Sequence, residues 1–224
     1  MLLDQVPVRS ALPQQTGDVS PALLASPLLQ SGGAGVYQGL LDEAGRQALL
    51  REALGLLPGA LDSRVDLPDT HEGRGGTPAR KFLSAPGGPV QDAFYTAPWM
   101  TMFLQQVTGL PIEPTGERGT YTFYVRSGDY LALHRDVERC DLAVITCLHD
   151  DSVTGASGGT LRIYPQHLNQ PLSAVRAQPI GFVDLQLQPG HTAVLYGGVI
   201  PHEVLPVALR QQRIVSVLCY HVRC

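Results

Sequence analysis

Apolar positions recur at helical spacing in two stretches of the first half of the chain. Residues 41–57 (LDEAGRQALLREALGLL) predict a helix with Asp42 as its N-cap and Pro58-Gly59 as its stop. Residues 90–110 predict a second helix that ends at Gly109, just before a proline. Residues 1–35 are rich in Pro, Gly, Ser and Gln, and this composition indicates an irregular arm.

Beyond residue 120 the pattern changes to short β-rich runs separated by Gly, Pro, Asp or Asn. Helices followed by regularly spaced strands indicate an α+β chain whose second half is a sandwich or jelly-roll barrel. At 224 residues we expect one domain, with residues 1–112 as arm, helices and loop, and residues 113–224 as barrel core. The predicted strands are 121–125, 129–137, 141–150, 158–165, 181–189, 191–197, 202–207 and 213–222.

Residues 62–88 are rich in Gly and Pro and are long for a plain connection. Loops of this length are often functional covers, so we expect this segment to lie over a binding site. The glycines of residues 32–35 precede no strand–helix unit and predict a flexible turn, not a phosphate-binding loop.

Composition and charge limit the kinds of binding partner and the compartment that we expect. A net charge of −4, without a basic stripe, gives no nucleic-acid footprint. No run approaches the ~18 apolar residues of a membrane helix, and the N-terminus lacks a signal-peptide pattern. The four cysteines form no CxxC pair, so we expect free, mostly buried thiols and a cytoplasmic protein: Cys140, Cys147, Cys219 and Cys224.

His134 and Asp136 are two residues apart in a predicted strand, so their side chains project from the same face. Two histidines and one carboxylate that leave open coordination positions are the ligand set of non-haem Fe(II) oxygenases. His202, which follows Pro201 at the start of a later strand, is the best candidate for the third ligand. We predict that none of the remaining histidines binds the metal: His71, His149, His167, His191 and His221.

Arg213 opens the last predicted strand, eleven residues after His202. Its side chain shares a face with Val215, Val217 and Cys219, so a mostly apolar face carries one cation at its head. Arginine is well suited to clamp a carboxylate through two hydrogen bonds. We therefore predict that Arg213 anchors the far end of a dicarboxylate co-substrate.

The sequence resembles the Fe(II)/2-oxoglutarate-dependent dioxygenases, and among them the prolyl-4-hydroxylase-like branch. The resemblance covers about residues 120–222 and rests on His134-Arg135-Asp136, Gly158-Gly159-Thr160-Leu161-Arg162-Ile163-Tyr164-Pro165, Pro201-His202-Glu203-Val204 and Arg213, which follow the family's order and spacing.

This resemblance implies a double-stranded β-helix, a jelly-roll or cupin-like barrel, with supporting N-terminal helices. Fe(II) would be held by His134, Asp136 and His202, and 2-oxoglutarate by Arg213 and Tyr124. Members of the family use O2, convert 2-oxoglutarate to succinate and CO2, and usually hydroxylate a substrate.

Three positions depart from the prolyl-4-hydroxylase pattern. Cys147 stands where a tyrosine is usual, Val215 takes the place of the serine in Arg-x-Ser, and Cys219 or Tyr220 replaces a tryptophan. Cys147 in place of a tyrosine would remove a hydrogen bond to the co-substrate or open space. The iron ligands and Arg213 are kept, so the departures argue against the substrate of the prolyl-4-hydroxylase branch and not against iron and 2-oxoglutarate binding. Because Asp136 is a carboxylate, the resemblance also argues against a halogenase.

The leading hypothesis is an oxygenase that acts on a small molecule, such as an amino acid or specialised metabolite. Arg126, Tyr130 and Arg162 are candidate substrate contacts, and no catalytic residue is expected beyond the metal ligands. One alternative is a prolyl or other residue hydroxylase acting on a peptide or protein. A second is a non-catalytic, cupin-like metal-binding barrel.

Overall fold

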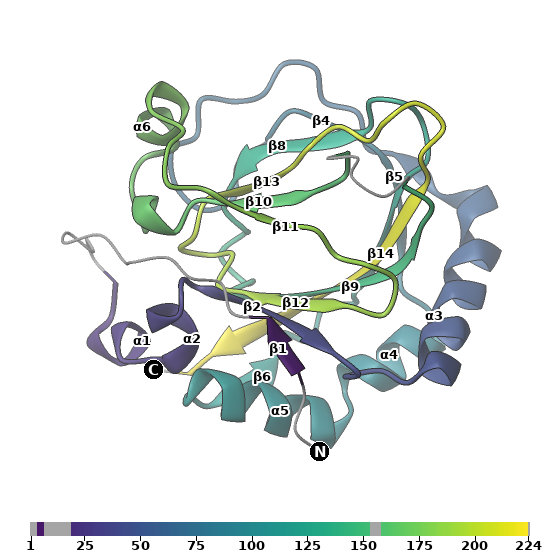
Figure 1. Cartoon of the computed structure of the whole chain (residues 1–224), viewed down its shortest axis with the longest axis horizontal. Coiled ribbons are helices and arrows are strands. Elements are labelled where there is room, and N and C mark those ends of the chain that lie inside the picture. Colours follow the sequence, from purple (N-terminus) through teal and green to yellow (C-terminus); the bar gives the residue numbers. More distant parts are fainter. Residues whose placement is uncertain (1–3, 7–18, 153–157, 224) are drawn as a thin grey trace.

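The computed structural model describes residues 4–6, 19–152 and 158–223, so Cys224 and residues 1–3 and 7–18 of the predicted N-terminal arm lie outside it. Two antiparallel sheets face each other, and helices cover the outer side of the larger one (Figure 1). The α+β prediction is therefore confirmed.

The larger sheet contains nine of the described strands. Their spatial order is β1-β2-β12-β9-β14-β7-β5-β3, and β6 pairs with the end of β14. The strands are β1 (Asp4–Val6), β2 (Ala34–Gln38), β3 (Leu61–Asp62), β5 (Leu83–Pro86), β6 (Ile112–Pro114), β7 (Thr120–Tyr124), β9 (Leu142–Asp150), β12 (Thr192–Leu195) and β14 (Arg213–Val222).

The smaller sheet contains five of the described strands, in the order β11-β10-β13-β8-β4. Each of the eight predicted strands corresponds to a strand in one of the two sheets. The strands of the smaller sheet are β4 (Arg80–Lys81), β8 (Tyr130–His134), β10 (Leu161–Ile163), β11 (Val183–Leu185) and β13 (His202–Val204).

The helices begin largely where the sequence predicts. Asp42 caps α3 by accepting a hydrogen bond from the Gly45 amide at 2.7 Å. The second predicted helix is wrong in one respect: it is two helices, α4 and α5, because Pro98 starts a new helix after a break at Thr96 and Ala97. The helices are α1 (Pro21–Leu24), α2 (Pro27–Gln30), α3 (Glu43–Leu56), α4 (Pro89–Tyr95), α5 (Pro98–Thr108) and α6 (Leu172–Ala177), with 3-10 turns η1 (Leu57–Gly59) and η2 (Pro165–His167).

The described part of the N-terminal arm is more regular than predicted. It contains α1, α2 and β2, and β2 pairs with β12 over four residues. The larger sheet therefore uses strands from both halves of the chain.

Strand β14 divides the interior into two layers because its side chains alternate. Ile214 and Tyr220 are buried on the helical side of the sheet, in separate apolar clusters with α3 and α5 residues. Arg213, Val217 and Cys219 line the space between the sheets. The predicted orientation of Arg213 is confirmed.

Candidate functional site

His134 and His202 lie opposite each other on neighbouring strands β8 and β13 of the smaller sheet. The register between these strands shifts, so that His202 pairs with His134 but Val204 pairs with Leu131. Strand β8 thus has one residue more than β13 over this interval, as in a β-bulge. The extra residue lets both Leu131 and His134 face the space between the sheets.

Asp136 follows the end of β8 and completes a cluster of three potential metal ligands. Its Oδ1 lies 3.7 Å from His134 Nε2 and 3.6 Å from His202 Nε2. One ligand atom from each residue lies within 4.8 Å of the others, the one such cluster of His, Cys, Asp or Glu among the described residues. The three residues chosen from the sequence are therefore brought together.

Backbone contacts orient both imidazoles. The Nδ1 atoms of His134 and His202 each lie 2.9 Å from a carbonyl oxygen, of Ala132 and Ile200 respectively. A carbonyl can only accept, so Nδ1 carries the proton and the Nε2 lone pair points into the cluster. Metal-binding histidines are commonly held in this way.

The donor set fits a divalent cation. Asp136 Oδ2 is buried and has no hydrogen-bond partner among the described residues, which is costly for a carboxylate oxygen unless a ligand satisfies it. Two nitrogens and a carboxylate on one side, with space opposite, match the Fe(II) arrangement and not the closed tetrahedral sites of structural zinc.

The three groups shift one another's pKa values. Burial acts to raise the pKa of Asp136, but the two imidazoles outweigh it and the pKa of Asp136 falls below its usual value. Burial, followed by repulsion from His202, lowers the pKa of His134. The pKa of His202 is raised, because Asp136 and the Ile200 carbonyl overcome the opposing effect of burial. Without a metal, an additional proton on the cluster is therefore favoured at His202 Nε2, beside Asp136 Oδ1.

Two glycines allow the backbone to lie close to functional side chains, Gly197 beside Asp136 and Gly159 beside Arg213. Gly197 accepts a hydrogen bond from the Asp136 amide at 2.9 Å, and a Cβ on Gly197 would overlap Asp136 Oδ2. Gly159 has a φ of +69°, and a Cβ there would lie 2.8 Å from Arg213 Cδ. Sequence analysis missed the role of Gly197; its signal was the Gly197-Gly198 pair just before the His202 strand.

A cavity of about 410 Å³ lies between the sheets and contains the metal-ligand cluster. Arg213 lines it and is 3% exposed. Its Nη1 donates to Asp150 Oδ2 at 2.7 Å and to the Leu187 carbonyl at 3.2 Å. No described residue accepts a hydrogen bond from its Nε or Nη2. One edge of the guanidinium is therefore held, and the other remains for a ligand in the cavity.

Tyr124 and Cys147 lie beside Arg213. Tyr124 pairs with Arg213 in the sheet register, lines the cavity, and has no hydrogen-bond partner for its hydroxyl among the described residues. Burial raises the pKa of Tyr124, so the phenol stays protonated and can donate. Cys147 Sγ is 3.6 Å from Arg213 Nη1, and burial raises the pKa of its thiol to about 11. Where the resembled family has a tyrosine, this chain therefore has a small, neutral side chain.

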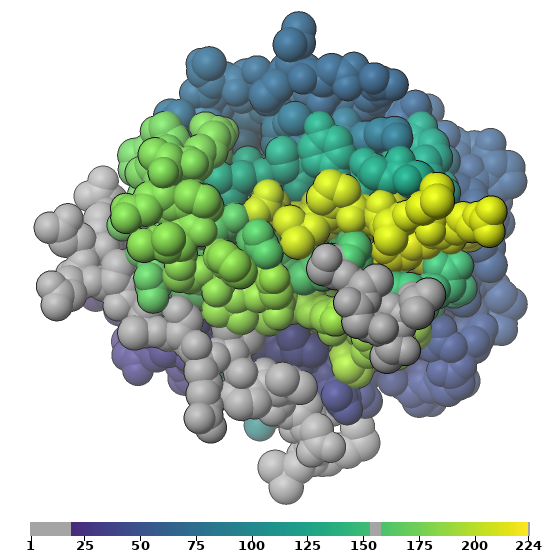
Figure 2. Space-filling view, turned by 45° about the horizontal axis from the view of Figure 1, so that its top comes forward, coloured from purple at the N-terminus to yellow at the C-terminus, as the bar shows by residue number. Residues whose placement is uncertain are grey.

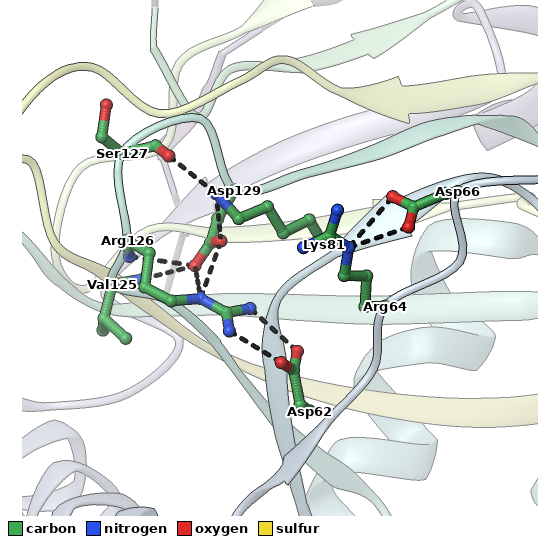
Figure 3. Close-up of polar contacts among 8 residues, drawn as sticks. All are labelled: Asp62, Arg64, Asp66, Lys81, Val125, Arg126, Ser127 and Asp129. Atoms are coloured by element: carbon green, nitrogen blue, oxygen red, sulfur yellow. Dashed lines mark hydrogen bonds and ion pairs between the residues drawn. The ribbon is translucent and has the colours of Figure 1, made fainter.

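The predicted substrate contacts Arg126, Tyr130 and Arg162 do not line this cavity. Arg126 is bound to Asp62 and to the fully buried Asp129, beside Lys81 (Figure 3).

The other two side chains point to the outer face of the smaller sheet. Arg162 pairs with Asp184 at 2.7 Å and lies 3.9 Å over the Phe182 ring. Its neighbour Leu161 lines the cavity instead, and Tyr130 likewise alternates with the cavity residue Leu131. The expectation that these three residues contact substrate is not supported, because side chains alternate between faces along a strand.

The prediction that the cysteines are free is wrong for one pair. Cys140 and Cys219 form a disulfide, and both line the cavity. It links the segment after Asp136 to the inner face of β14. Cys147 is free and buried. Since a disulfide is rare in a reducing compartment, the thiol argument for a cytoplasmic location no longer holds.

The Gly/Pro-rich segment of residues 62–88 forms part of the cavity wall, through Gly75, Pro78 and Phe82 among others. Figure 2 shows the part between β3 and β4 (blue) lying across the top of the molecule in that view.

This segment also holds the backbone around Asp136. The Gly75 amide donates to the Asp136 carbonyl at 3.2 Å, and Arg74 pairs with Asp141 at 2.7 Å. Arg74 Nη2 donates to three further carbonyls, those of Val137, Glu138 and Cys140. The cover segment and the metal-ligand segment are therefore fixed to each other.

Known structures share this fold. The epimerase SnoN from nogalamycin biosynthesis, described as non-haem and alpha-ketoglutarate dependent, is 15% identical, with a TM-score of 0.65 over 84% of this chain and 76% of that one. EctD from S. alaskensis, with 2-oxoglutarate and 5-hydroxyectoine, is 14% identical, with a TM-score of 0.62 over 97% and 83%. A Pseudomonas putida prolyl-4-hydroxylase is 17% identical, with a TM-score of 0.59 over 86% and 94%.

The chain thus has the fold of the Fe(II)/2-oxoglutarate oxygenase superfamily. No family model matches the sequence, and no curated protein matches it either. Among the described residues, no helix has the length and apolar character needed to cross a membrane.

Proposed function

We propose that the protein is an Fe(II)/2-oxoglutarate-dependent oxygenase built on a double-stranded β-helix, and that residues 1–224 form one catalytic unit. The observation that carries the proposal is a single cavity that contains both a buried His-Asp-His cluster and an arginine with one free edge. His134, Asp136 and His202 hold the iron. The fold shared with known oxygenases supports the same assignment.

When bound, Fe(II) together with 2-oxoglutarate and O2 supplies the oxidising power to insert one oxygen atom into a substrate C–H bond, with succinate and CO2 as the other products. Arg213 binds the distal carboxylate of 2-oxoglutarate through Nε and Nη2, while Asp150 fixes the opposite edge of the guanidinium. Tyr124 donates a hydrogen bond to the same carboxylate. Apolar residues such as Val215 and Ile145 exclude water from the cavity.

We infer a small-molecule substrate, because the cover segment forms part of the cavity wall and the cavity of about 410 Å³ must also accommodate 2-oxoglutarate. A prolyl or other residue hydroxylase acting on a peptide is the second candidate. It is favoured by the similarity to the Pseudomonas putida prolyl-4-hydroxylase and to a prolyl hydroxylase from Trichoplax adhaerens that was solved with a peptide fragment. A non-catalytic metal-binding barrel has no use for Arg213 inside the cavity.

Anaerobic titration with Fe(II) and 2-oxoglutarate tests this function. We expect a weak visible charge-transfer band, followed by succinate formation when O2 is admitted. His134→Ala should remove the band, whereas Arg162→Gln, on the outer face of the smaller sheet, should keep it. The proposal fails if the wild-type protein binds no 2-oxoglutarate and His134→Ala retains the wild-type metal content.

A further inference from the structure

Three arginines line the cavity, and they differ in their partners. Arg213 is held by Asp150, and Arg135 donates to Asn169 Oδ1 and to the Glu72 carbonyl. The Arg80 side chain makes no hydrogen bond or ion pair with any described residue. A guanidinium has five N–H donors and a fixed positive charge, so Arg80 is a cation in the cavity wall with no partner among the described residues.

The strand register places Arg80 on the inner face. Arg80 on β4 pairs with Leu131 on β8, and Leu131 pairs in turn with Val204 on β13. All three line the cavity. The neighbouring residue Lys81 has the opposite orientation, and its Nζ donates to the Ser127 carbonyl outside the cavity (Figure 3).

The chain that follows Arg80 adds further side chains to the cavity wall. Phe82 and Ser84 follow at alternate positions and also line the cavity. Ser84 Oγ lies 3.2 Å from Ser63 Oγ, and Thr122 pairs with Ser84 in the adjacent strand. The larger sheet and Ser63 thus contribute hydroxyl groups to the same cavity that Arg80 of the smaller sheet lines.

No described carboxylate forms an ion pair with Arg80. Asp136 is the one described acidic residue that lines the cavity, and it belongs to the metal-ligand cluster. Asp150 is engaged by Arg213 and Gln211. None of the described residues supplies a carboxylate to Arg80, so its donors are available to a ligand in the cavity. Arg80 is partly exposed, so a ligand that approaches from solvent can reach it.

We propose that Arg80 binds a carboxylate of the substrate, and that the enzyme therefore acts on a small carboxylic acid. This inference rests on the proposed function, because it assigns the 2-oxoglutarate carboxylate to Arg213 and leaves Arg80 for the second reactant. An internal residue of a peptide has no α-carboxylate, so the assignment favours a small acid over a protein substrate.

The test compares matched acids and amides on the anaerobic Fe(II) protein saturated with 2-oxoglutarate. The probes are N-acetyl-L-proline with its amide, and benzoate with benzamide, titrated by calorimetry. We expect each acid to bind the wild-type protein at least about tenfold more tightly than its amide, since a charge-assisted hydrogen bond is lost in the amide.

Arg80→Gln should abolish this difference, and Arg80→Lys should restore part of it. The matched control is Arg162→Gln, which removes the same charge from the outer face and should leave the acid preference unchanged. The charge-transfer band is recorded in every sample, so that occupancy by 2-oxoglutarate is known independently.

The inference is overturned if neither acid binds the wild-type protein, if acids and amides bind equally, or if Arg80→Gln keeps the preference. It is also overturned if Arg80→Gln weakens 2-oxoglutarate binding instead, because Arg80 would then belong to the co-substrate site. These results leave the proposed function intact as long as the wild-type band forms. Absence of the band in the wild-type protein rejects the proposed function, and the inference with it.

Discussion

The two faces of the smaller sheet carry the same residue types but differ in what these residues contact. On the inner face, Arg80 has no side-chain partner in the described part of the chain, and it lines a cavity that also contains the metal ligands. On the outer face, Arg162 pairs with Asp184, and Glu203 accepts a hydrogen bond from Tyr164 at 2.5 Å. The outer face satisfies its own charges, whereas the inner face leaves charges and lone pairs for ligands.

The largest difference between the faces should appear when a carboxylate is removed from each. Asp136→Ala takes one of three ligands and should lower metal affinity by more than about 100-fold, beyond the 10–100-fold typical when only a hydrogen-bond partner of a ligand is changed. Asp184→Ala on the outer face should leave metal binding unchanged. Metal content after dialysis at a buffered free metal concentration measures both. Equal metal content in the two variants would contradict the assignment of Asp136.

Across the cavity, Arg213→Gln should weaken the binding of 2-oxoglutarate while the metal stays bound. Loss of one partner from a desolvated charged contact costs about 2–5 kcal/mol, which corresponds to roughly 30- to several thousand-fold in affinity. The variant also leaves Asp150 without its ion-pair partner, so thermal unfolding must be measured alongside. Arg213→Lys, which keeps the charge, is the control for folding. Unchanged 2-oxoglutarate affinity in a folded Arg213→Gln protein would remove Arg213 from the co-substrate site.

Local patterns in the sequence were enough to predict the strands and the inner face of β14, because a period of two needs no knowledge of the partner strand. The same rule predicted His134 and Asp136 on one side, and the structure brings them together although Asp136 lies two residues beyond the end of β8. His202 was predicted because it opens a later strand after Pro201. The N-cap Asp42 was likewise predictable, since capping depends on a few neighbouring residues.

Features that depend on the partner strand were not predictable. The register shift in β8 exists only relative to β13. Without it, Leu131 and His134, which are three residues apart, would project from opposite faces of the sheet. The Cys140–Cys219 disulfide spans 79 residues and follows from the contact of two distant segments. Arg162 was assigned to the wrong face because a strand of three residues gives no long alternation from which to judge.

Gly197→Ala tests how closely the backbone must approach the inner-face cluster. The added Cβ overlaps Asp136 Oδ2, so the carboxylate must move away from its position between the two imidazoles. We expect metal affinity to fall by about 10–100-fold, with a loss of about 1–3 kcal/mol in the free energy of unfolding. Gly116→Ala is a weaker control, because its Cβ meets no atom within 4 Å although its φ is +80°. Wild-type metal affinity in Gly197→Ala would show that Asp136 tolerates the displacement.

Metal binding should also depend on pH, since the metal must displace the proton from His202. The raised pKa of His202 lies above 6.5. Apparent affinity should therefore weaken about tenfold for each pH unit below that raised pKa and level off above it. In the metal-free protein, the contribution of His202 to the free energy of unfolding should instead decrease as the pH rises. A raised folded-state pKa gives stability that is fully present below about pH 6.5 and is lost as the pH rises through the raised value.

Co(II) titrations between about pH 5.5 and 8.5, with a competing chelator of known affinity, measure this dependence. Denaturant unfolding of the metal-free protein over the same range measures the stability trend. A metal affinity that does not change with pH would show that His202 Nε2 carries no proton in the metal-free protein, although Nε2 lies 3.6 Å from Asp136 Oδ1.

The smallest effect is expected for Arg162→Gln, the outer-face counterpart of Arg80→Gln. Arg162 is 24% exposed as a side chain, and its partner Asp184 is 39% exposed. Ion pairs near the surface contribute about 0–1 kcal/mol, so unfolding should shift by no more than this. Affinities for metal and 2-oxoglutarate should match those of the wild type, because the side chain points away from the cavity. If Arg162→Gln instead altered either affinity by tenfold, the two faces would be energetically coupled, and strand parity alone would no longer separate ligand-binding residues from structural ones.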